Sequence, residues 1–270
     1  MTLTIQRAER AVRSRGAARL WLPAVTIVGL LALWELAVRG GLFPERYAPP
    51  PTVILVQLLG MLVEPGVWQA VGDTLTGWGI SLLISVVAGT VLGTILGRFA
   101  AASAFFRPIV EFLRPIPSIA MIPLAVLMIG SGKPTEVFLA TYAGLWQMLV
   151  AAVAAVDAVD PVGLQTARSF ALSRGDQVKY VMLPSMLPRL VTGVRIASST
   201  VLIFCITAEL LIGVPGLGAG LGAARGVGDM PRMYAYVVII GVLGYALSAL
   251  FKLLETRLLF WHESVRGAHR

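Results

Sequence analysis

Charged residues are scarce in this sequence, at 13% of 270 residues, whereas hydrophobic residues make up 57%. So apolar a composition cannot be only a water-soluble core and must face lipid. The chain also lacks any polar stretch long enough for a separate soluble domain of ordinary size. Its single cysteine, Cys205, lies within an apolar run, which excludes a disulfide within the chain. The sequence therefore predicts one integral membrane domain.

Nucleotide-binding motifs are also missing. GSGKP (130–134) has Leu127 where a phosphate-binding loop needs its first glycine, and Pro134 where that loop needs Ser or Thr. The glycines of GVPGLGAGLG (213–222) follow no predicted strand and fit no dinucleotide-binding pattern. We predict no catalytic, cofactor-binding or metal-binding residues, so the chain is not expected to be an enzyme. Energy for any transport must come from another chain or from an ion gradient.

Long apolar runs predict membrane-spanning helices, because a helix needs about 20 residues to cross roughly 30 Å of hydrocarbon. Six such runs are found, at 20–38, 75–97, 111–130, 137–156, 191–213 and 233–251. We therefore predict an all-α membrane protein with six transmembrane helices. Pro115, Pro117 and Pro123 should break or bend the third helix. Gly89, Gly93 and Gly97 in the second should let another helix approach closely, and a helix of the same chain is the favoured partner.

The positions of Lys and Arg predict the orientation, since cytoplasmic loops retain cations. Cations gather before the first run, after the second, between the fourth and fifth, and after the sixth. Both termini are therefore expected in the cytoplasm of a cell (inner or plasma) membrane protein, with basic tails at 1–19 and 262–270 around a transmembrane domain at 20–261. Topology thus explains the net charge of +8, and no nucleic-acid binding is expected.

The loop between the fourth and fifth runs, about 158–189, contains a predicted amphipathic helix. Asp160 can cap it and Pro161 can begin it. The helix is expected to run to about Arg174, where Gly175 can take the left-handed conformation that ends a helix. Leu164, Ala167, Phe170 and Ala171 recur at helical spacing as one apolar stripe.

A second segment of this loop, DQVKYVMLP (176–184), is predicted to end at Pro184, with Pro188 re-entering the membrane. An interfacial helix lying on lipid headgroups would explain the first segment. It would not explain the second. We therefore favour a contact with a partner.

These residues carry a resemblance. LQTARSFALSRGDQVKYVMLPSMLPRLVTGVRIA (164–197) resembles the EAA loop of binding-protein-dependent ABC importer permeases, whose pattern is Glu-Ala-Ala, three residues, Gly, then Ile-x-Leu-Pro after a fixed gap. The triplet is matched by Gln165, Thr166 and Ala167, the glycine by Ala171, and the last motif by Val181, Leu183 and Pro184. Four more segments resemble, in the same order, the branch that imports sulfonates, taurine and nitrate: YAPPPTVILVQLL (47–59), LRPIPSIAMIPLAVLMIGSG (113–132), AELLIGVPGLGAGL (208–221) and LLETRLLFW (253–261).

The resemblance implies a type I ABC importer permease fold with its core at about 70–255. It also implies that the loop is a coupling helix seated on a cytoplasmic ABC ATPase, which holds ATP and Mg. Further implied partners are a periplasmic or lipid-anchored substrate-binding protein and a second permease copy, as a homodimer. The expected ATPase-coupling residues are Gln165, Thr166, Ala167, Arg168, Phe170, Ala171, Arg174, Gly175, Leu183 and Pro184.

Two of these residues depart from the family pattern. Gln165 replaces the usual Glu, so an ion pair with the partner would become a weaker neutral hydrogen bond. Ala171 replaces Gly, which is expected to favour the helix by roughly 1 kcal/mol.

Polar residues within the spans are candidates for the translocation pathway, because they are costly in lipid and usually functional. Glu209 is either a pathway or gate residue or a structural carboxylate bonded to a neighbouring helix. Trp146 and Gln147 either line a cavity or pack in the core, and the bend at Pro117 and Ser118 either borders the pathway or is architectural.

The expected function is a pathway for a small solute, driven by a separate ATPase. A small anion such as a sulfonate, taurine, nitrate or bicarbonate is the first expectation, and a pyrimidine-type vitamin precursor stays open. The alternative is an ion-gradient-driven secondary transporter or channel. That class typically shows inverted repeats and clustered intramembrane carboxylates, and neither is evident in the sequence.

Overall fold

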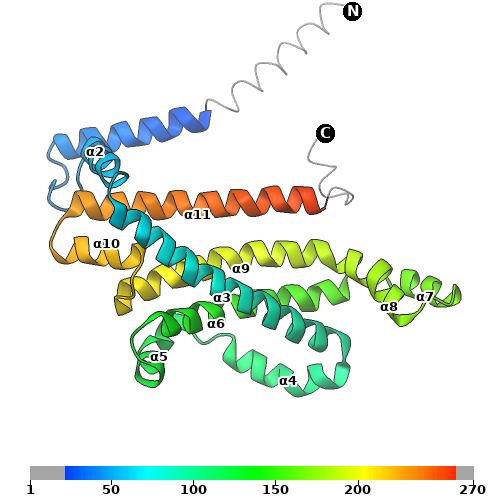
Figure 1. Cartoon of the computed structure of the whole chain (residues 1–270). Coiled ribbons are helices and arrows are strands. Elements are labelled where there is room, and N and C mark those ends of the chain that lie inside the picture. The colour runs from blue at the N-terminus through cyan, green and yellow to red at the C-terminus, as the bar shows by residue number, and fades with distance from the viewer. Residues whose placement is uncertain (1–21, 260–270) are drawn as a thin grey trace, which may run out of the picture.

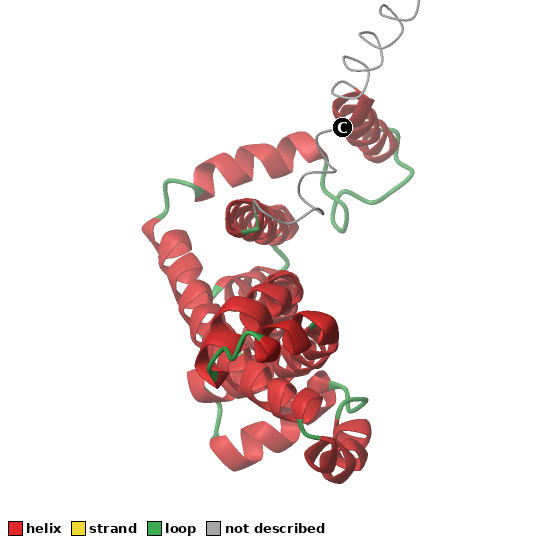
Figure 2. Ribbon diagram, turned by 90° about the vertical axis from the view of Figure 1, so that its right-hand side faces the viewer, coloured by secondary structure: helices red, strands yellow, loops and turns green. Residues whose placement is uncertain are grey.

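The computed structural model describes residues 22–259, and every regular element among them is helical (Figure 2). The predicted basic tails, 1–19 and 262–270, lie outside the described residues. Within the described residues, the all-α prediction is confirmed.

Five helices are each long and apolar enough to cross a membrane. They are Leu22–Arg39, α3 (Pro65–Arg98), α6 (Lys133–Asp157), the helical stretch Arg174–Gly226, whose longest part is α9 (Leu183–Ile212), and α11 (Met230–Leu258). Each contains or closely matches one predicted span, but α3 begins at Pro65 rather than 75 and α9 at Leu183 rather than 191. Pro65 in the first turn of α3 costs no hydrogen bond, because the N–H groups of a first turn have no acceptor within the helix.

The third predicted span is not one helix. The chain forms α4 (Ala100–Leu113), breaks, and continues as η1 (Ser118–Met121) and α5 (Ile122–Ile129), with an 81° bend between the two parts. The predicted break of the third span is therefore confirmed, although its first part begins at Ala100 rather than at 111. Pro115 and Pro117 lie in the break, where they remove backbone donors and disfavour helical geometry in the residue before each. If the bent pair counts as one span, the described residues contain six.

Two short helices were not predicted: α2 (Pro51–Met61) and α10 (Leu217–Gly226). Both pack on α11 and lie at the same end of the molecule, opposite α7 and α8 (Figure 1). Their lengths fall well below the 20 or so residues of a membrane span, so a hydropathy search passes over them. Gly213, with φ of 80°, takes the left-handed conformation that ends α9 and turns the chain toward α10.

The core of the molecule is α6, which packs against both α3 and α9. Glycines on α3 allow its close approach. A Cβ on Gly93 would lie 2.5 Å from the carbonyl oxygen of Leu149, and one on Gly89 would lie 2.5 Å from the Cβ of Met148. The glycines therefore contact a helix of the same chain, as predicted.

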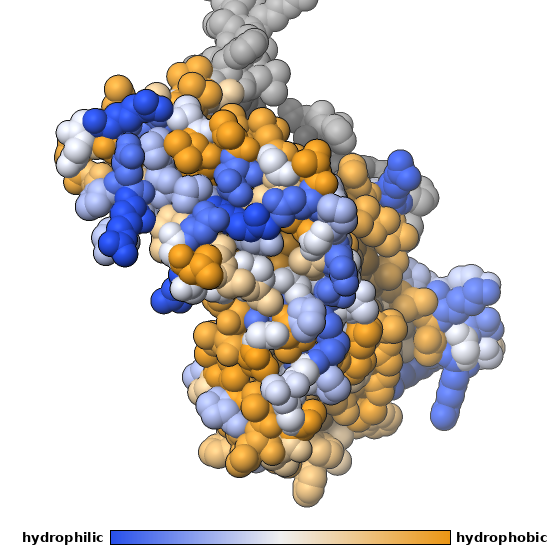
Figure 3. Space-filling model, turned by 60° about the vertical axis from the view of Figure 1, so that its left-hand side comes forward, coloured by the Kyte–Doolittle hydropathy of each residue, from blue (hydrophilic) through white to orange (hydrophobic). Residues whose placement is uncertain are grey.

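The outer helices leave most of their apolar side chains uncovered. Val25, Val28, Leu33 and Leu36 on the first helix are all exposed, as are Val242 and Tyr245 on α11. Hydrophobic residues, drawn in orange in Figure 3, cover much of the visible surface. Contact with lipid tails keeps such side chains out of water, so this surface is typical of a membrane protein.

Candidate functional site

The predicted coupling loop begins as expected. Helix α7 (Pro161–Ser169) has Pro161 in its first turn, and the Asp160 side chain accepts a hydrogen bond from the amide of Val162 at 2.9 Å. The carboxylate satisfies a free donor and also lies at the positive end of the helix dipole.

The end of α7 differs from the prediction. The helix stops at Ser169, and Ala171, with φ of 54°, is the one non-glycine residue with positive φ among the described residues. The amide of Leu172 bonds to the Ala167 carbonyl at 3.0 Å and that of Ala171 to the Arg168 carbonyl at 2.9 Å. This pair of bonds is the Schellman arrangement, which places a left-handed residue just after the helix.

Two expectations about this turn are therefore wrong. Gly175 does not end the helix, because it lies within the next helix, α8 (Arg174–Gln177). Ala171 does not favour the helix, because it is outside it in a conformation that costs a non-glycine residue about 1–2 kcal/mol. Glycine at this position of the family pattern would avoid that cost.

Beyond the turn, the chain is helical almost without interruption. Ser173 caps α8, accepting a hydrogen bond from the amide of Asp176 at 3.2 Å, and a π-helical turn, η2 (Val178–Met182), joins α8 to α9. The prediction that this segment ends at Pro184 is wrong, since Pro184 lies in the first turn of α9 and Pro188 inside it. A π turn of this kind is frequent at functional sites.

The loop presents a mixed apolar and cationic surface. Phe170 is 77% exposed, and Tyr180 and Leu183 are also exposed. Gln165, Thr166, Arg168, Arg174, Gly175 and Pro184 are exposed as well, whereas Ala167 is buried beneath them. The predicted apolar stripe is therefore divided, with Ala167 packing inward and Phe170 pointing away from the chain. An exposed aromatic ring among cations is typical of a protein interface.

Glu209 lies near the other end of α9 and is fully buried. Its carboxylate accepts hydrogen bonds from the Thr74 hydroxyl at 2.8 Å and from the Gly218 amide at 2.8 Å. The Thr74 oxygen in turn accepts from the amide of Leu217, the first residue of α10, at 2.9 Å. One carboxylate thus connects α9 with α3 and with the positive end of α10. These are the contacts of a carboxylate bonded to neighbouring helices.

A second buried carboxylate, Glu136, was not predicted from the sequence. It is fully buried in the first turn of α6, with Lys133 Nζ 2.8 Å from its Oε2. Lys133 also donates to the carbonyls of Asp73 at 3.0 Å and Pro215 at 3.4 Å. Gly77 of α3 leaves room for this carboxylate, which a side chain there would displace. The only signal in the sequence was the Lys-x-x-Glu spacing at the start of an apolar run.

The remaining pathway candidates do not surround Glu209. Trp146 lies ten positions beyond Glu136 on α6, or about 15 Å by helical rise. Its ring packs edge-on against Tyr142, with centroids 5.5 Å apart, and its indole N–H has no partner among the described residues. Gln147 is exposed. At the bend between α4 and α5, Ser118 is buried and Pro117 exposed.

Residues 85–260 match the family described as the binding-protein-dependent transport system inner membrane component. The chain belongs to this family. The match covers the bent pair, the loop and the helices on both sides of it. Membership of this family favours an ATP-driven importer over the ion-gradient-driven transporter. Two buried carboxylates of the kind expected for a gradient-driven transporter, Glu136 and Glu209, do lie at the same end of the helices.

Curated relatives align with this permease over most of their length. The taurine transport system permease protein of Escherichia coli (strain K12) is 28% identical over 89% of this chain and 90% of that protein. The putative aliphatic sulfonates transport permease protein of Bacillus subtilis (strain 168) is 24% identical, over 92% and 88%. The riboflavin transport system permease protein of Chloroflexus aurantiacus (strain ATCC 29366 / DSM 635 / J-10-fl) is 27% identical, over 97% and 99%.

A solved structure supports the architecture. A chain of the MetNI methionine ABC transporter in inward-facing conformations superposes with a TM-score of 0.62, at 22% identity, covering 72% of this permease and 98% of that chain. At this identity the likeness concerns the fold alone. The type I ABC importer permease fold is confirmed.

Proposed function

We propose that this permease forms the pathway of an ABC importer for a small anion, such as a sulfonate, taurine, nitrate or bicarbonate. The relatives named for taurine and aliphatic sulfonates support this substrate class, and the relative named for riboflavin keeps a vitamin or its precursor as the competing one. A separate cytoplasmic ABC ATPase binds ATP and Mg and supplies the energy. This chain catalyses no reaction.

The exposed Phe170 carries the proposal. It follows directly on α7, which lies at one end of the molecule (Figure 1). In the assembled importer, its ring inserts into a cleft of the ATPase. The same loop exposes Arg168, Arg174 and Lys179, whose positive charge meets acidic groups of the partner. Gln165 adds a neutral hydrogen bond in place of an ion pair.

The assembly contains two permease copies as a homodimer, two ATPases and one periplasmic or lipid-anchored substrate-binding protein. The cations of the loop and the end of α11 lie at one end of the molecule (Figure 1), which supports an inner-membrane orientation with both termini in the cytoplasm. The binding protein docks at the opposite end, where α2 and α10 lie.

Helix α9 transmits the movement. It extends from the loop to Glu209, and its 30 residues span about 45 Å. When the ATPases close, the displacement of Phe170 passes through α8 and η2 into α9 and reaches the helices joined at Glu209. The pathway follows the helices that move: Glu209 on α9, Trp146 and Gln147 on α6, and the bend at Pro117 and Ser118.

Co-purification tests this proposal. The tagged permease is solubilised from its host in mild detergent, and its partners are identified by mass spectrometry. We expect a stoichiometric P-loop ATPase that is lost in Phe170→Asp. Val227→Asp is the matched control, because Val227 is as exposed as Phe170, at 82% against 77%, but lies directly after α10. Recovery of the permease without any ATPase, or equal retention in both variants, would contradict the proposal.

A further inference from the structure

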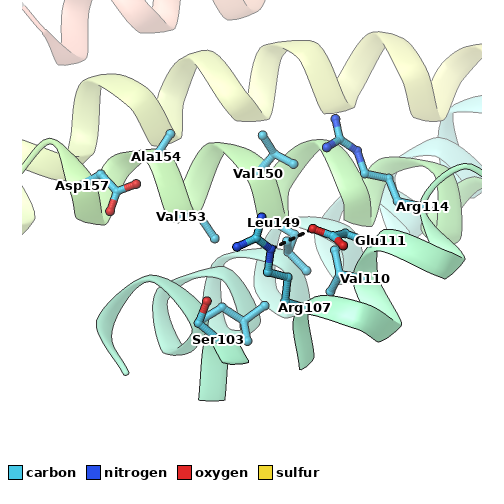
Figure 4. A pocket seen from close by; sticks show the side chains of 11 residues that line it. Ser103, Arg107, Val110, Glu111, Arg114, Leu149, Val150, Val153, Ala154 and Asp157 are labelled. Atoms are coloured by element: carbon cyan, nitrogen blue, oxygen red, sulfur yellow. Dashed lines mark hydrogen bonds and ion pairs between the residues drawn. The ribbon is translucent and has the colours of Figure 1, made fainter. Parts of the chain in front are cut away.

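A groove of about 340 Å³ opens between α4, α6 and the end of α3 (Figure 4). This volume is in the range of small-molecule sites. The groove ends beside Asp157, the last residue of α6, so it lies toward the coupling loop and not toward Glu209.

The floor of the groove is apolar. Val150, Val153 and Ala154 follow one another at helical spacing on α6 and line the groove, with Val153 directed toward α4 (Figure 4), and Val110 of α4 also lines it. A hydrocarbon chain placed along this face would remove apolar surface from water.

The charges are concentrated at the edges of the groove. The Arg107 guanidinium bonds to Glu111 at 2.8 Å, so this pair is already neutral. Arg114 projects toward α6 and makes no side-chain hydrogen bond or ion pair with any described residue. Asp157 lies at the far end, separated from Arg114 by the apolar floor (Figure 4). An anionic head group is therefore favoured beside Arg114, and a second one at the other end is disfavoured.

We propose that this groove binds an amphiphilic monoanion, an alkanesulfonate with a short alkyl chain, on the cytoplasmic half of its path. The inference rests on the proposed import function and narrows its substrate class. Arg114 binds the sulfonate oxygens, and the valines of α6 contact the alkyl chain. Nitrate and bicarbonate contain no hydrocarbon for this floor. An anionic phospholipid shares the head-group and chain chemistry, and the test separates the two.

Binding to the full-length permease tests the site directly. The protein is placed in phosphatidylcholine nanodiscs and titrated calorimetrically with methanesulfonate, butanesulfonate and hexanesulfonate. We expect Kd to fall about twofold to threefold for each added methylene, somewhat less than full burial would give because the groove is open. Arg114→Gln is expected to weaken all three ligands about tenfold. Arg98→Gln, an exposed cation at the end of α3 that does not line the groove, should bind like the wild type.

A second variant tests the floor. Val153→Ser should weaken the binding of hexanesulfonate more than that of methanesulfonate and so reduce the gain for each methylene. A Kd independent of chain length, or equal binding by Arg114→Gln and Arg98→Gln, overturns the proposal. So does loss of hexanesulfonate binding when phosphatidylglycerol is added to the nanodiscs, because the groove would then be a lipid site.

The two proposals fail separately. If co-purification from the host recovers no ATPase while the nanodisc titration still shows sulfonate binding, the import function is contradicted and the groove proposal stands. An ATPase that co-purifies with a permease unable to bind any alkanesulfonate would leave the import function intact and refute the groove. Phe170→Asp should bind hexanesulfonate like the wild type, since the loop is no part of the groove.

Discussion

The Thr74 hydroxyl donates to the Glu209 carboxylate at 2.8 Å across 135 residues of sequence, and both side chains are fully buried. The same oxygen accepts from the Leu217 amide, so one hydroxyl joins three helices. Removing it would leave a buried carboxylate and a buried amide each short of a partner, and such losses are larger than the net gain from forming a bond.

Thr74→Val should therefore destabilise the permease by about 1–3 kcal/mol, since valine keeps the shape and removes the hydroxyl. Thr76→Val is the control, because Thr76 is exposed and bonds only to the Gly72 carbonyl of its own helix. Thermal unfolding in detergent measures both. Equal melting temperatures for the two variants would show that the Thr74 bond adds no stability.

Gly93→Ala should weaken the packing of α3 on α6. The new Cβ would lie 2.5 Å from a backbone oxygen of Leu149, which cannot rotate away, so a loss of about 1–3 kcal/mol is expected. Gly79→Ala on the same helix has open space and should be neutral or stabilising by up to about 1 kcal/mol. The melting temperatures of the two variants are compared in detergent. A Gly93→Ala variant more stable than Gly79→Ala would refute the close approach of α3 and α6.

Ala171→Gly should stabilise the coupling loop by up to about 1 kcal/mol, because glycine adopts positive φ without the Cβ penalty. Hydrogen exchange at the Leu172 amide, which bonds to the Ala167 carbonyl, should slow. Ala167→Gly, the same change within α7, should have the opposite effect on that amide. Faster exchange in Ala171→Gly would mean that the left-handed turn is not formed.

The acid stability of the end of the molecule that contains α2 and α10 should depend on Glu64, which precedes α3 and accepts a hydrogen bond from Arg232 of α11 at 3.1 Å. This hydrogen bond holds the pKa of Glu64 below its ordinary value. The pair therefore stabilises the fold above about pH 4.3, the unfolded value, and this contribution is lost as the pH falls through the lower folded-state pKa.

Glu64→Gln should consequently lower the melting temperature at pH 6. The difference in melting temperature between the variant and the wild type should become smaller at pH 3. Arg232→Gln should show the same pH dependence, because either change removes the pair. A gap that is constant with pH in both variants would exclude the ion pair as its source.

Several features were predictable because their signals are local. Asp160 and Pro161 mark the start of α7 through bonds made within one turn, and Pro115 and Pro117 break the third span wherever it packs. The coupling-loop pattern was recognisable despite Gln165 and Ala171. The left-handed turn at Ala171 was missed since alanine gives no such signal, and its conformation follows from two backbone bonds.

The sequence by itself determined the membrane class, the number of spans and the family, because hydropathy and proline act through neighbouring residues. Only the tertiary structure decided which polar groups meet. Glu209 was a candidate from the sequence, but its partner Thr74 was not identifiable there. Lys133 and Glu136 gave only the signal of their spacing, and Arg114 gave none. Their partners come from helices far apart in the chain, and in a bilayer a buried charge is stable only where packing brings it a partner.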